Sequence, residues 1–457
     1  MMRSFSLIDI ATATRGRLTQ NSSVEIKRVS TDTRSVREGD LFVALRGENF
    51  DAHDFVGEAE RKGAAAVVVS NELDLGIPQV VVIDTTEALG NIAHANRLFF
   101  NKPLIGITGS CGKTSVKSLL TDILSGCGRV LATKGNFNNH IGVPLTLFDL
   151  QPEHDFAVIE MGASGPNEIG YLAGIAKPTI GLITNALRAH VEGFGGIEGV
   201  AKAKGQMYSS LDDADIAVLN KDDPAYVQWC ELVGDRRSLT FSLEDDQADF
   251  YATNLAVTER GQEFDLCSNG EVHSITLQLL GSHNVANALA ASACAYAAGA
   301  DLLTIKTGLE SSEAVAGRMQ VLDGVHGAAI IDDSYNANPD SVRAAINALA
   351  QRAGRTVFVL GDLAELGSET KPLHAELGQY AKEQGVSNLL TVGELTASAS
   401  NAFGVNSEHF SDQAELIARL KSILGKQTEE STTVLVKGSR VSHMERVVTA
   451  LLRDGEE

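Results

Sequence analysis

The chain has 457 residues, of which 44% are apolar, and carries a formal net charge of −21. This length is too great for one ordinary hydrophobic core and predicts roughly three domains of about 150 residues each. The acidic charge argues against nucleic acid and anionic membranes as partners, but it leaves room for a nucleotide held by a few local donors and a metal ion.

Cysteine usage and the amino terminus both point to the cytoplasm. The cysteines show no CxxC spacing, which argues against a disulfide framework and a structural zinc site. The first apolar stretch meets Asp9 early, so it lacks the long uncharged core of a signal peptide. Residues 272–300 carry no formal charge, but their Ala-rich, Asn-containing composition predicts a buried helix and no membrane insertion. The cysteines are Cys111, Cys127, Cys230, Cys267 and Cys294.

Residues 1–102 read as a small α/β domain. Short apolar runs at 41–45, 65–69 and 80–83 predict strands, and the segment 86–100 has the pattern of a helix. Pro103 marks the predicted boundary with the next domain.

Residues 103–313 read as a doubly wound domain with a parallel sheet. Apolar strands at 104–108, 156–160 and 178–185 alternate with helical segments, which is typical of a sheet covered on both faces. Three shorter alternating strands between residues 250 and 279 predict an antiparallel extension ahead of an Ala-rich helix.

Residues 314–457 read as a second open α/β unit, similar in layout to dinucleotide-binding folds. Its expected strands are 328–333, 356–362, 388–393 and 432–438, separated by helical stretches. The predicted fold class is therefore α/β in three domains.

The strongest motif is a glycine-rich turn between the strand 104–108 and an amphipathic helix. Backbone N–H groups of such a turn approach phosphate oxygens, and the helix dipole adds to the attraction. Lys113 would reach the β- and γ-phosphates of a nucleotide, and Thr114 would hold Mg²⁺. Ile107 stands where the strict pattern has glycine, so the match is GxxGKT only. The predicted cofactor-binding residues here are Gly109, Ser110, Cys111, Gly112, Lys113, Thr114 and Ser115.

Three further side chains could serve a metal site beside this loop. Glu160 ends a strand at the edge where ligands of such folds bind, although a solvent-facing glutamate is the alternative. His190 follows another strand end, but a lone loop histidine is usually inert, and Mg²⁺ prefers oxygen. Lys204 lies fourteen residues further on, and by spacing alone it would be a surface residue.

The third segment holds polar turns that could face a ligand. Asp333, Tyr335 and Asn336 leave a strand into an Asx-rich turn, which is commonly only a helix cap. Arg318 lies at the entrance to this domain and could span to a nucleotide. Lys437, Ser439 and Arg440 follow an apolar strand and suit a bound carboxylate, or they are simply solvated.

In order and spacing, these motifs resemble the Mur ligases over essentially the whole chain. The phosphate loop of that family also lacks the first glycine. The resemblance implies that Thr114, Glu160, His190 and a carbamylated Lys204 bind Mg²⁺, and that Lys113, His190 and Lys204 are catalytic. It also implies that Asn284 and Asn287 lie on the adenine side of ATP. Arg318, Asp333, Tyr335 and Asn336 would then close on ATP from the third domain.

Within the family, the branch that adds D-alanyl-D-alanine is the one resembled. The segments at 29–55, 133–144, 332–339, 361–367 and 434–440 carry this likeness. Two departures are His140, where an acidic residue is common, and TNALRAH in place of TNIGxAH. The resemblance implies that Lys437, Ser439 and Arg440 bind the dipeptide carboxylate. It implies that Ser30, Asp32, Thr33 and Arg34 bind the uridine diphosphate, and Asn136, Asn138 and Asn139 the sugar and peptide.

The implied activity is ATP-dependent ligation of D-alanyl-D-alanine to UDP-N-acetylmuramoyl-tripeptide by a cytoplasmic monomer, through an acyl phosphate. A neighbouring ligase that adds the third amino acid or a polyglutamate tail would use the same activation. A phosphate-loop switch without ligation is the alternative from another class. Whether the third residue of the tripeptide is lysine or diaminopimelate does not follow from the sequence.

Overall fold

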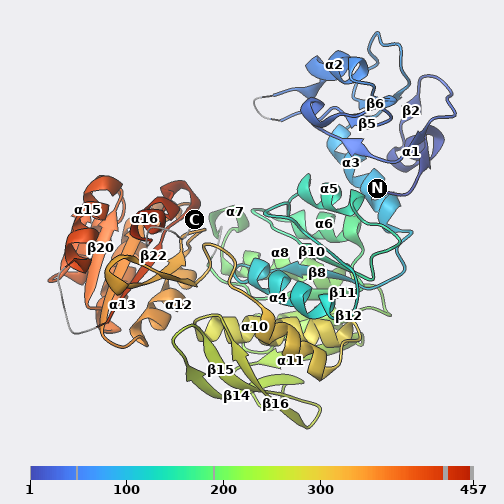
Figure 1. Cartoon of the computed structure of the whole chain (residues 1–457). Helices are drawn as coiled ribbons and strands as arrows, with labels where there is room; N and C mark the ends of the chain where they lie inside the picture. The colour runs from blue at the N-terminus through green and yellow to red at the C-terminus, as the bar shows by residue number, and fades with distance from the viewer. Residues whose placement is uncertain (1, 48–49, 189–190, 426–430, 453–457) are drawn as a thin grey trace.

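The chain folds into three α/β domains, which confirms the predicted fold class. The computed structural model describes residues 2–47, 50–188, 191–425 and 431–452. Figure 1 shows the N-terminal domain (blue) above a central domain (cyan to yellow), with the C-terminal domain (orange to red) beside the central one. Among the described residues, no helix is long and apolar enough to cross a membrane.

The N-terminal domain contains a five-stranded sheet, and its last helix leads into the central domain. The sheet order is β2-β7-β6-β5-β4, and only β2 runs antiparallel to its neighbour. Asp84 caps α3 by accepting hydrogen bonds from the backbone of Thr86 and Glu87. The main elements are α1 (Leu7–Thr14), β2 (Arg17–Leu18), β4 (Val29–Ser30), β5 (Leu41–Val43), α2 (Val56–Arg61), β6 (Ala66–Val69), β7 (Gln79–Val81) and α3 (Thr85–Arg97), and a small pair joins β1 (Phe5–Ser6) to β3 (Glu25–Ile26).

The central domain is built on one nine-stranded sheet. Its order is β16-β15-β14-β13-β12-β11-β8-β10-β9, parallel from β9 to β14 and antiparallel over the last three strands. The predicted antiparallel extension is thus joined to the parallel sheet through β13. The strands are β8 (Leu104–Thr108), β9 (Val130–Ala132), β10 (Phe156–Glu160), β11 (Ile180–Ile183), β12 (Ile216–Asn220), β13 (Arg237–Ser242), β14 (Phe250–Val257), β15 (Gln262–Ser268) and β16 (Glu271–Leu277).

Two layers of helices cover this sheet and form separate hydrophobic cores. One core contains the apolar faces of α4, α10 and α11, and the other contains those of α5, α6 and α8. The charge-free stretch at 272–300 divides between β16 and the buried helix α10, so the buried helix predicted from composition occupies its second part, and the first part is the strand predicted from alternation. The helices are α4 (Lys113–Ser125), α5 (Gly142–Phe148), α6 (Glu168–Ala176), α7 (Val191–Phe194), α8 (Ile197–Ser209), α9 (Tyr226–Val233), α10 (Ser282–Ala297) and α11 (Leu302–Ser311).

The C-terminal domain has a six-stranded sheet with a core on each face. The order is β17-β18-β22-β19-β20-β21, so the last strand of the chain lies between two earlier ones, and only β17 is antiparallel. The elements are β17 (Gln320–Asp323), β18 (Ala329–Asp333), α12 (Pro339–Ala350), β19 (Arg355–Gly361), α13 (Thr370–Glu383), β20 (Asn388–Val392), α14 (Ala397–Phe403), β21 (Ser407–Phe410), α15 (Gln413–Leu424), β22 (Thr432–Lys437) and α16 (Glu445–Leu451).

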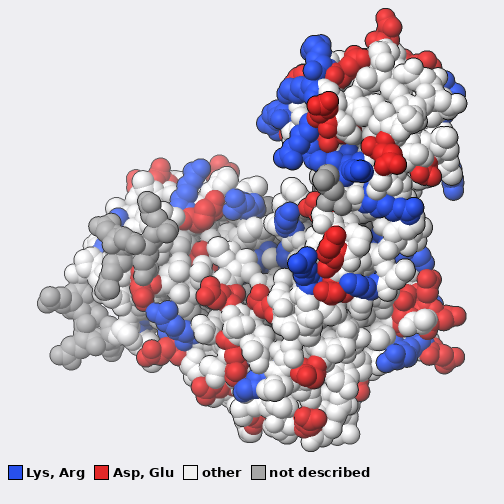
Figure 2. All heavy atoms as spheres, turned by 45° about the vertical axis from the view of Figure 1, so that its right-hand side comes forward, with Lys and Arg blue, Asp and Glu red and all other residues white. Residues whose placement is uncertain are grey.

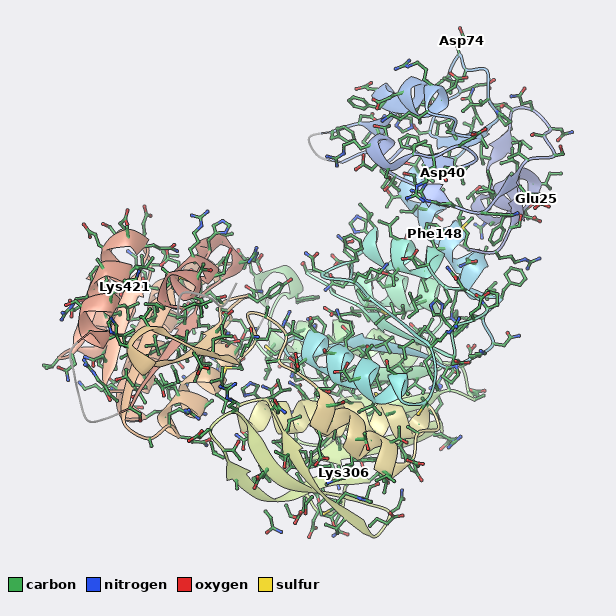
Figure 3. The ribbon with its side chains drawn as sticks, viewed as in Figure 1. Glu25, Asp40, Asp74, Phe148, Lys306 and Lys421 are labelled. Atoms are coloured by element: carbon green, nitrogen blue, oxygen red, sulfur yellow. The ribbon has the colours of Figure 1, made fainter. Side chains whose placement is uncertain are left out.

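The two junctions between domains are built differently. One hydrophobic core runs from α1 and α3 into α5, α6 and α8 without interruption, and Figure 3 places Phe148, at the end of α5, directly beneath the N-terminal domain. The C-terminal domain has its own cores, and Leu280 is the one described residue of the central domain that belongs to them. The central and C-terminal domains therefore meet mainly through polar groups.

Candidate active site

The glycine-rich turn after β8 is held tightly against the neighbouring strand and helix. Gly109 and Gly112 have φ angles of +149° and +84°. A Cβ on Gly109 would lie 1.8 Å from Thr184 Oγ1, and one on Gly112 would lie 2.3 Å from Asn287 Oδ1. Because no other residue fits either the backbone angle or the space, both glycines are required for this turn.

The ends of β11 and α4 complete the turn. Thr184 Oγ1 donates to Cys111 O at 2.6 Å, and Cys111 N donates to Asn185 Oδ1 at 2.9 Å. Lys113 Nζ donates to Gly109 O at 2.8 Å, so its ammonium lies over the loop. Burial lowers the pKa of Lys113. The turn thus combines a helix N-terminus with one half-buried cation, a combination suited to phosphate.

Glu160 lies beside this turn at the carboxyl end of β10. Its Oε2 accepts from Thr114 Oγ1 at 2.9 Å and lies 3.2 Å from Lys117 Nζ, while its Oε1 accepts from Asn138 at 2.8 Å. Burial raises the pKa of Glu160, but the charges of Lys113 and Lys117 and the two hydrogen bonds outweigh it, so the net shift is downward. The carboxylate is therefore ionised and fully held by donors.

Lys204 is buried in α8 on the same side of the cleft. The residue is 3% exposed, and its Nζ lies 5.9 Å from the Phe194 ring centroid. Burial, followed by the charge of Lys113, lowers the pKa of Lys204 to about 7. The described residues offer it no carboxylate within ion-pair distance. The predicted metal ligand His190 lies outside the described residues.

The side chains predicted for the adenine side belong to the first turns of α10. Asn284 Nδ2 donates to Leu280 O at 2.8 Å, and Asn287 Nδ2 donates to Asn284 Oδ1 at 3.0 Å. His283 also lines the cleft, and burial, followed by the charge of Lys437, lowers its pKa to about 4. These groups line the same cleft as Glu160.

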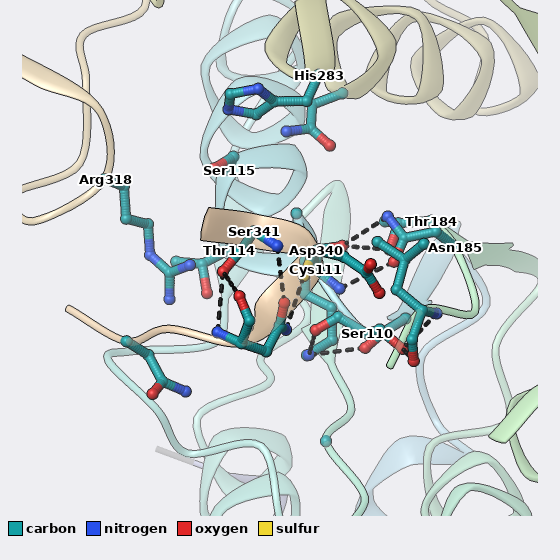
Figure 4. A pocket seen from close by; sticks show the side chains of 18 of the residues that line it. Ser110, Cys111, Thr114, Ser115, Thr184, Asn185, His283, Arg318, Asp340 and Ser341 are labelled. Atoms are coloured by element: carbon teal, nitrogen blue, oxygen red, sulfur yellow. Dashed lines mark hydrogen bonds between the residues drawn. The ribbon is translucent and has the colours of Figure 1, made fainter. Parts of the chain in front are cut away.

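The third domain reaches the glycine-rich turn through the loop that begins α12. Asn338 Nδ2 donates to Cys111 Sγ at 3.1 Å, and Asp340 Oδ2 accepts from Arg188 N at 2.8 Å. Figure 4 shows Asp340 and Ser341 beside Ser110 and Cys111, with Arg318 approaching from the same domain. The turn and the third domain thus form two walls of one cleft.

That cleft has a volume of about 590 Å³ and gathers most of the predicted site residues. The other predicted residues that the structure describes lie outside it: Ser30, Asp32, Thr33, Arg34, Ser439 and Arg440. The predicted residues that line it are Gly109, Ser110, Cys111, Gly112, Lys113, Thr114, Ser115, Asn136, Asn138, Asn139, Glu160, Lys204, Asn284, Asn287, Arg318, Asp333, Tyr335, Asn336 and Lys437.

Each of the three domains matches a known protein family. Family models match residues 25–97 (Mur ligase family, catalytic domain), 107–295 (Mur ligase middle domain) and 317–440 (Mur ligase, glutamate ligase domain). The UDP-N-acetylmuramoyl-tripeptide–D-alanyl-D-alanine ligase of Escherichia coli K12 is 44% identical over 99% of this chain and 100% of its own length. The chain belongs to the Mur ligase family.

Solved structures agree with this placement. A crystal structure of MurF from Acinetobacter baumannii is similar with a TM-score of 0.93 and 34% identity, covering 98% of both chains. MurF ligase from Thermotoga maritima in complex with ADP has a TM-score of 0.83 and 28% identity, covering 93% of this chain and 96% of that one.

The N-terminal residues predicted to bind uridine diphosphate lie on β4 and the turn after it. Ser30 is buried and its hydroxyl donates to Asp32 O at 3.0 Å, and the Asp32 carboxylate caps the turn and pairs with Arg34 at 2.6 Å. Figure 2 shows Lys and Arg gathered on one side of the N-terminal domain, above the hollow beside it. This cationic side stands out on a Mur ligase whose net charge is −21.

The residues predicted to bind the dipeptide differ in how exposed they are to solvent. Lys437 is buried, and its ammonium pairs with Asp333 Oδ2 at 2.6 Å. Ser439 Oγ donates to Asp362 O at 2.5 Å. The Arg440 guanidinium is half-exposed and lies 5.8 Å from the Tyr335 ring centroid, while that of Arg318 lies 4.4 Å from the same centroid.

Sequence reasoning missed several residues of the cleft in this Mur ligase. Thr184 and Asn185 lie at a predicted strand end, and that position alone could have marked them. His283 had no signal of its own, because it lies in the charge-free stretch at 272–300 that reads as a buried helix. Lys117 does not line the cleft but lies beside Glu160, and it had no signal, because it lies beyond the phosphate-loop pattern and one helical turn after Lys113.

Proposed function

We propose that this Mur ligase joins D-alanyl-D-alanine to UDP-N-acetylmuramoyl-tripeptide with ATP, giving the pentapeptide nucleotide, ADP and phosphate. Likeness to the Escherichia coli ligase over the whole chain carries the choice of substrates. The cleft between the phosphate loop and the third domain supports the activation chemistry. A monomer that works in the cytoplasm stays a prediction.

A carboxylate is a poor acyl donor, so it has to be activated before an amine can attack it. The γ-phosphoryl group would pass to an oxygen of the tripeptide carboxylate, and ADP would leave. The dipeptide amine would then attack the acyl carbon, phosphate would leave with the bonding electrons, and the amine would lose a proton. Such phosphoryl transfer asks the protein mainly for positioning and charge neutralisation.

The glycine-rich turn would cradle the nucleotide phosphates. Lys113 would leave Gly109 O for the β- and γ-phosphates, and Asn284 and Asn287 would border the adenine end. Arg318 and Tyr335 would meet the nucleotide from the third domain, whose approach keeps water from the acyl phosphate.

The groups around Glu160 fit Mg²⁺. Thr114 Oγ1 and Glu160 Oε2 are oxygen donors 2.9 Å apart, and oxygen is what this ion prefers. The described residues contain no cluster of three or more His, Cys, Asp or Glu that could bind a metal, so other oxygens would come from phosphate and water. Bound there, Mg²⁺ would neutralise charge on the transferred phosphoryl group.

Lys204 would contribute as a carbamate. With its pKa lowered to about 7, a large share of the amine is neutral near neutral pH, which is the form that adds carbon dioxide. Carbamylation would replace a buried ammonium by an oxygen donor, and His190 would complete the set.

The two substrates would enter from opposite sides of the cleft. Ser30, Asp32, Thr33 and Arg34 would bind the uridine diphosphate at the cationic side of the N-terminal domain, and Asn136, Asn138 and Asn139 the sugar and peptide. Ser439 and Arg440 would bind the dipeptide carboxylate, and Lys437 would join them by leaving Asp333.

The test is incubation of the purified protein with Mg-ATP, UDP-N-acetylmuramoyl-tripeptide and D-alanyl-D-alanine, with phosphate release and product mass as readouts. Each acceptor is then omitted in turn. Phosphate release that needs both acceptors, with a pentapeptide product, is the expected result. Product with a single amino acid would indicate a neighbouring ligase, and release without either acceptor would indicate a switch.

A further inference from the structure

Lys117 is a buried cation in the active-site region with no role in the mechanism above. It lies on α4, one turn after Lys113, and the whole residue is 7% exposed. Its Nζ lies 3.2 Å from Glu160 Oε2 and donates to Gly135 O at 3.2 Å. Glu160 is itself only 2% exposed. One ammonium therefore joins a buried carboxylate to a backbone carbonyl of a different segment.

That segment is the asparagine loop, residues 134–141, between β9 and α5. Asn138 Nδ2 donates to Glu160 Oε1 at 2.8 Å, and Asn138 O accepts from Gly162 N at 2.8 Å. A Cβ on Gly162 would come within 3.0 Å of the Asn138 side chain, so the loop lies close against the end of β10. Glu160 thus meets the loop directly through Asn138 and indirectly through Lys117.

Asn139 contacts a different part of the same loop. Its Oδ1 accepts from Ile141 N at 3.1 Å and Gly142 N at 2.9 Å, at the start of α5. Asn139 therefore anchors the loop at its far end, whereas Lys117 and Asn138 anchor it beside Glu160.

We propose that Lys117 is a positioning residue that couples the metal-binding carboxylate of Glu160 to the asparagine loop that holds the muramoyl-peptide substrate. This inference rests on the proposed function, which assigns the metal to Glu160 and the substrate to the loop. Burying an ammonium is costly unless it is well paired. Here both partners of Lys117 belong to the site, so a change of Lys117 should alter the affinities for the substrate and for the metal ion.

The two effects of Lys117 have opposite signs. Its hydrogen bond to Gly135 O orders the loop, so losing it weakens binding of the UDP-tripeptide. Its positive charge, 3.2 Å from Glu160 Oε2, repels a divalent cation at that oxygen. Removing the charge therefore leaves metal binding equal or tighter. A purely structural lysine would weaken both together.

Lys117→Met removes the ammonium and keeps the length of the side chain. We expect the Kd and KM for UDP-N-acetylmuramoyl-tripeptide to rise about tenfold, as for loss of one charge-assisted hydrogen bond. Calorimetry without ATP gives that Kd, free of turnover. The KM for ATP should change less than about threefold, and Mn²⁺ should bind the ADP complex with equal or higher affinity in a spectroscopic titration.

Two further variants separate coupling from folding. Lys117→Gln keeps a donor for Gly135 O without the charge, so it should recover part of the substrate affinity. Lys306→Met is the matched control, because Lys306 also lies on a helix and contacts one carbonyl, Ser274 O, and one carboxylate, Glu310. Lys306 does not line the cleft, and Figure 3 shows it on the lower part of the central domain. This variant should bind substrate and metal as the wild type does.

Unchanged affinity of Lys117→Met for the UDP-tripeptide would overturn the inference. So would a parallel fall in substrate, ATP and Mn²⁺ binding with a lower melting temperature, since that describes a collapsed site. Wild-type protein that does not bind the UDP-tripeptide would instead overturn the proposed function.

Discussion

The N-terminal domain and the third domain are attached to the central domain in opposite ways. Three polar side chains of α3 satisfy backbone carbonyls of the central domain. Arg97 donates to Ala176 O and Lys177 O, both at 2.7 Å, and Asn96 donates to Leu147 O at 2.8 Å. His94 Nδ1 donates to Ile175 O at 2.9 Å. Around these bonds runs one continuous hydrophobic core.

The third domain instead contributes isolated polar contacts, such as those of Asn338 and Asp340. Polar contacts can be broken and remade in water at little cost, whereas opening a shared core exposes apolar surface. From this difference we expect the N-terminal junction to stay rigid and the junction with the third domain to be the one that can open and close.

The largest effect should come from Lys204, at the junction that carries the chemistry. Lys204→Ala should lower the rate of ligation about 100-fold or more, as expected for a group that completes a metal site. Short carboxylates added to the buffer should restore part of the activity. The melting temperature should change little, because the described residues offer the Lys204 side chain no carboxylate partner that the variant would leave unpaired. Full activity of this variant would contradict the proposed role.

Breaking the N-terminal junction should cost stability and leave the chemistry in place. Arg97→Met would leave the carbonyls at the end of α6 without donors and should lower the free energy of unfolding by about 2–4 kcal/mol. Urea titration measures this. Lys102→Met removes a half-exposed ion pair to Asp155 nearby and should cost less than about 1 kcal/mol. Equal losses in the two variants would argue against a rigid junction.

The polar junction should also be sensitive to acid. Because burial lowers the pKa of His283 from 6.5 to about 4, the unfolded chain binds more protons than the folded one between these values. The contribution of His283 to the free energy of unfolding is therefore fully present above about pH 6.5, and it is lost as the pH falls to about 4. His283→Gln should show a flatter dependence of the urea midpoint on pH in that window, and an unchanged slope would exclude His283 as the cause.

Closure of the third domain should be visible in solution. Mg-ATP should make the small-angle scattering profile of the wild type more compact as the third domain closes, and identical profiles would contradict this.

The smallest effect should come from a single contact between the third domain and the β14–β15 hairpin. Arg352 donates to Glu259 O at 2.7 Å and Thr258 O at 3.2 Å. Arg352→Ala should reduce the compaction and raise the KM for ATP no more than about threefold.

The alternation of strands and helices was enough to predict three α/β domains and a parallel sheet. Strand order was not predictable, because the place of β22 between β18 and β19 depends on contacts between residues about 80 to 100 positions apart. The shared core at the N-terminal junction was also missed, since Pro103 reads as a boundary whatever packs around it.

The site residues also divide into those that local sequence patterns predict and those that depend on long-range contacts. Lys113 and Glu160 lie in a motif and at a strand end, so local pattern predicted their place. Lys117 and His283 have their place in the site only because segments distant in the sequence fold back onto them. Roles assigned through the family resemblance, including those of His190 and Arg440, stay predictions.

The attachment of Leu280 to the core of the third domain has a mechanical consequence. Leu280 lies just before α10, and the connection after α11 enters the same domain near Gly317, so these two attachments differ from the polar contacts between the domains. When the polar contacts break and these two attachments persist, we expect rotation about the line through them to be easier than sliding or tilting. An acceptor carried by the third domain would then travel along one arc and meet the activated carboxylate in the same orientation on each cycle.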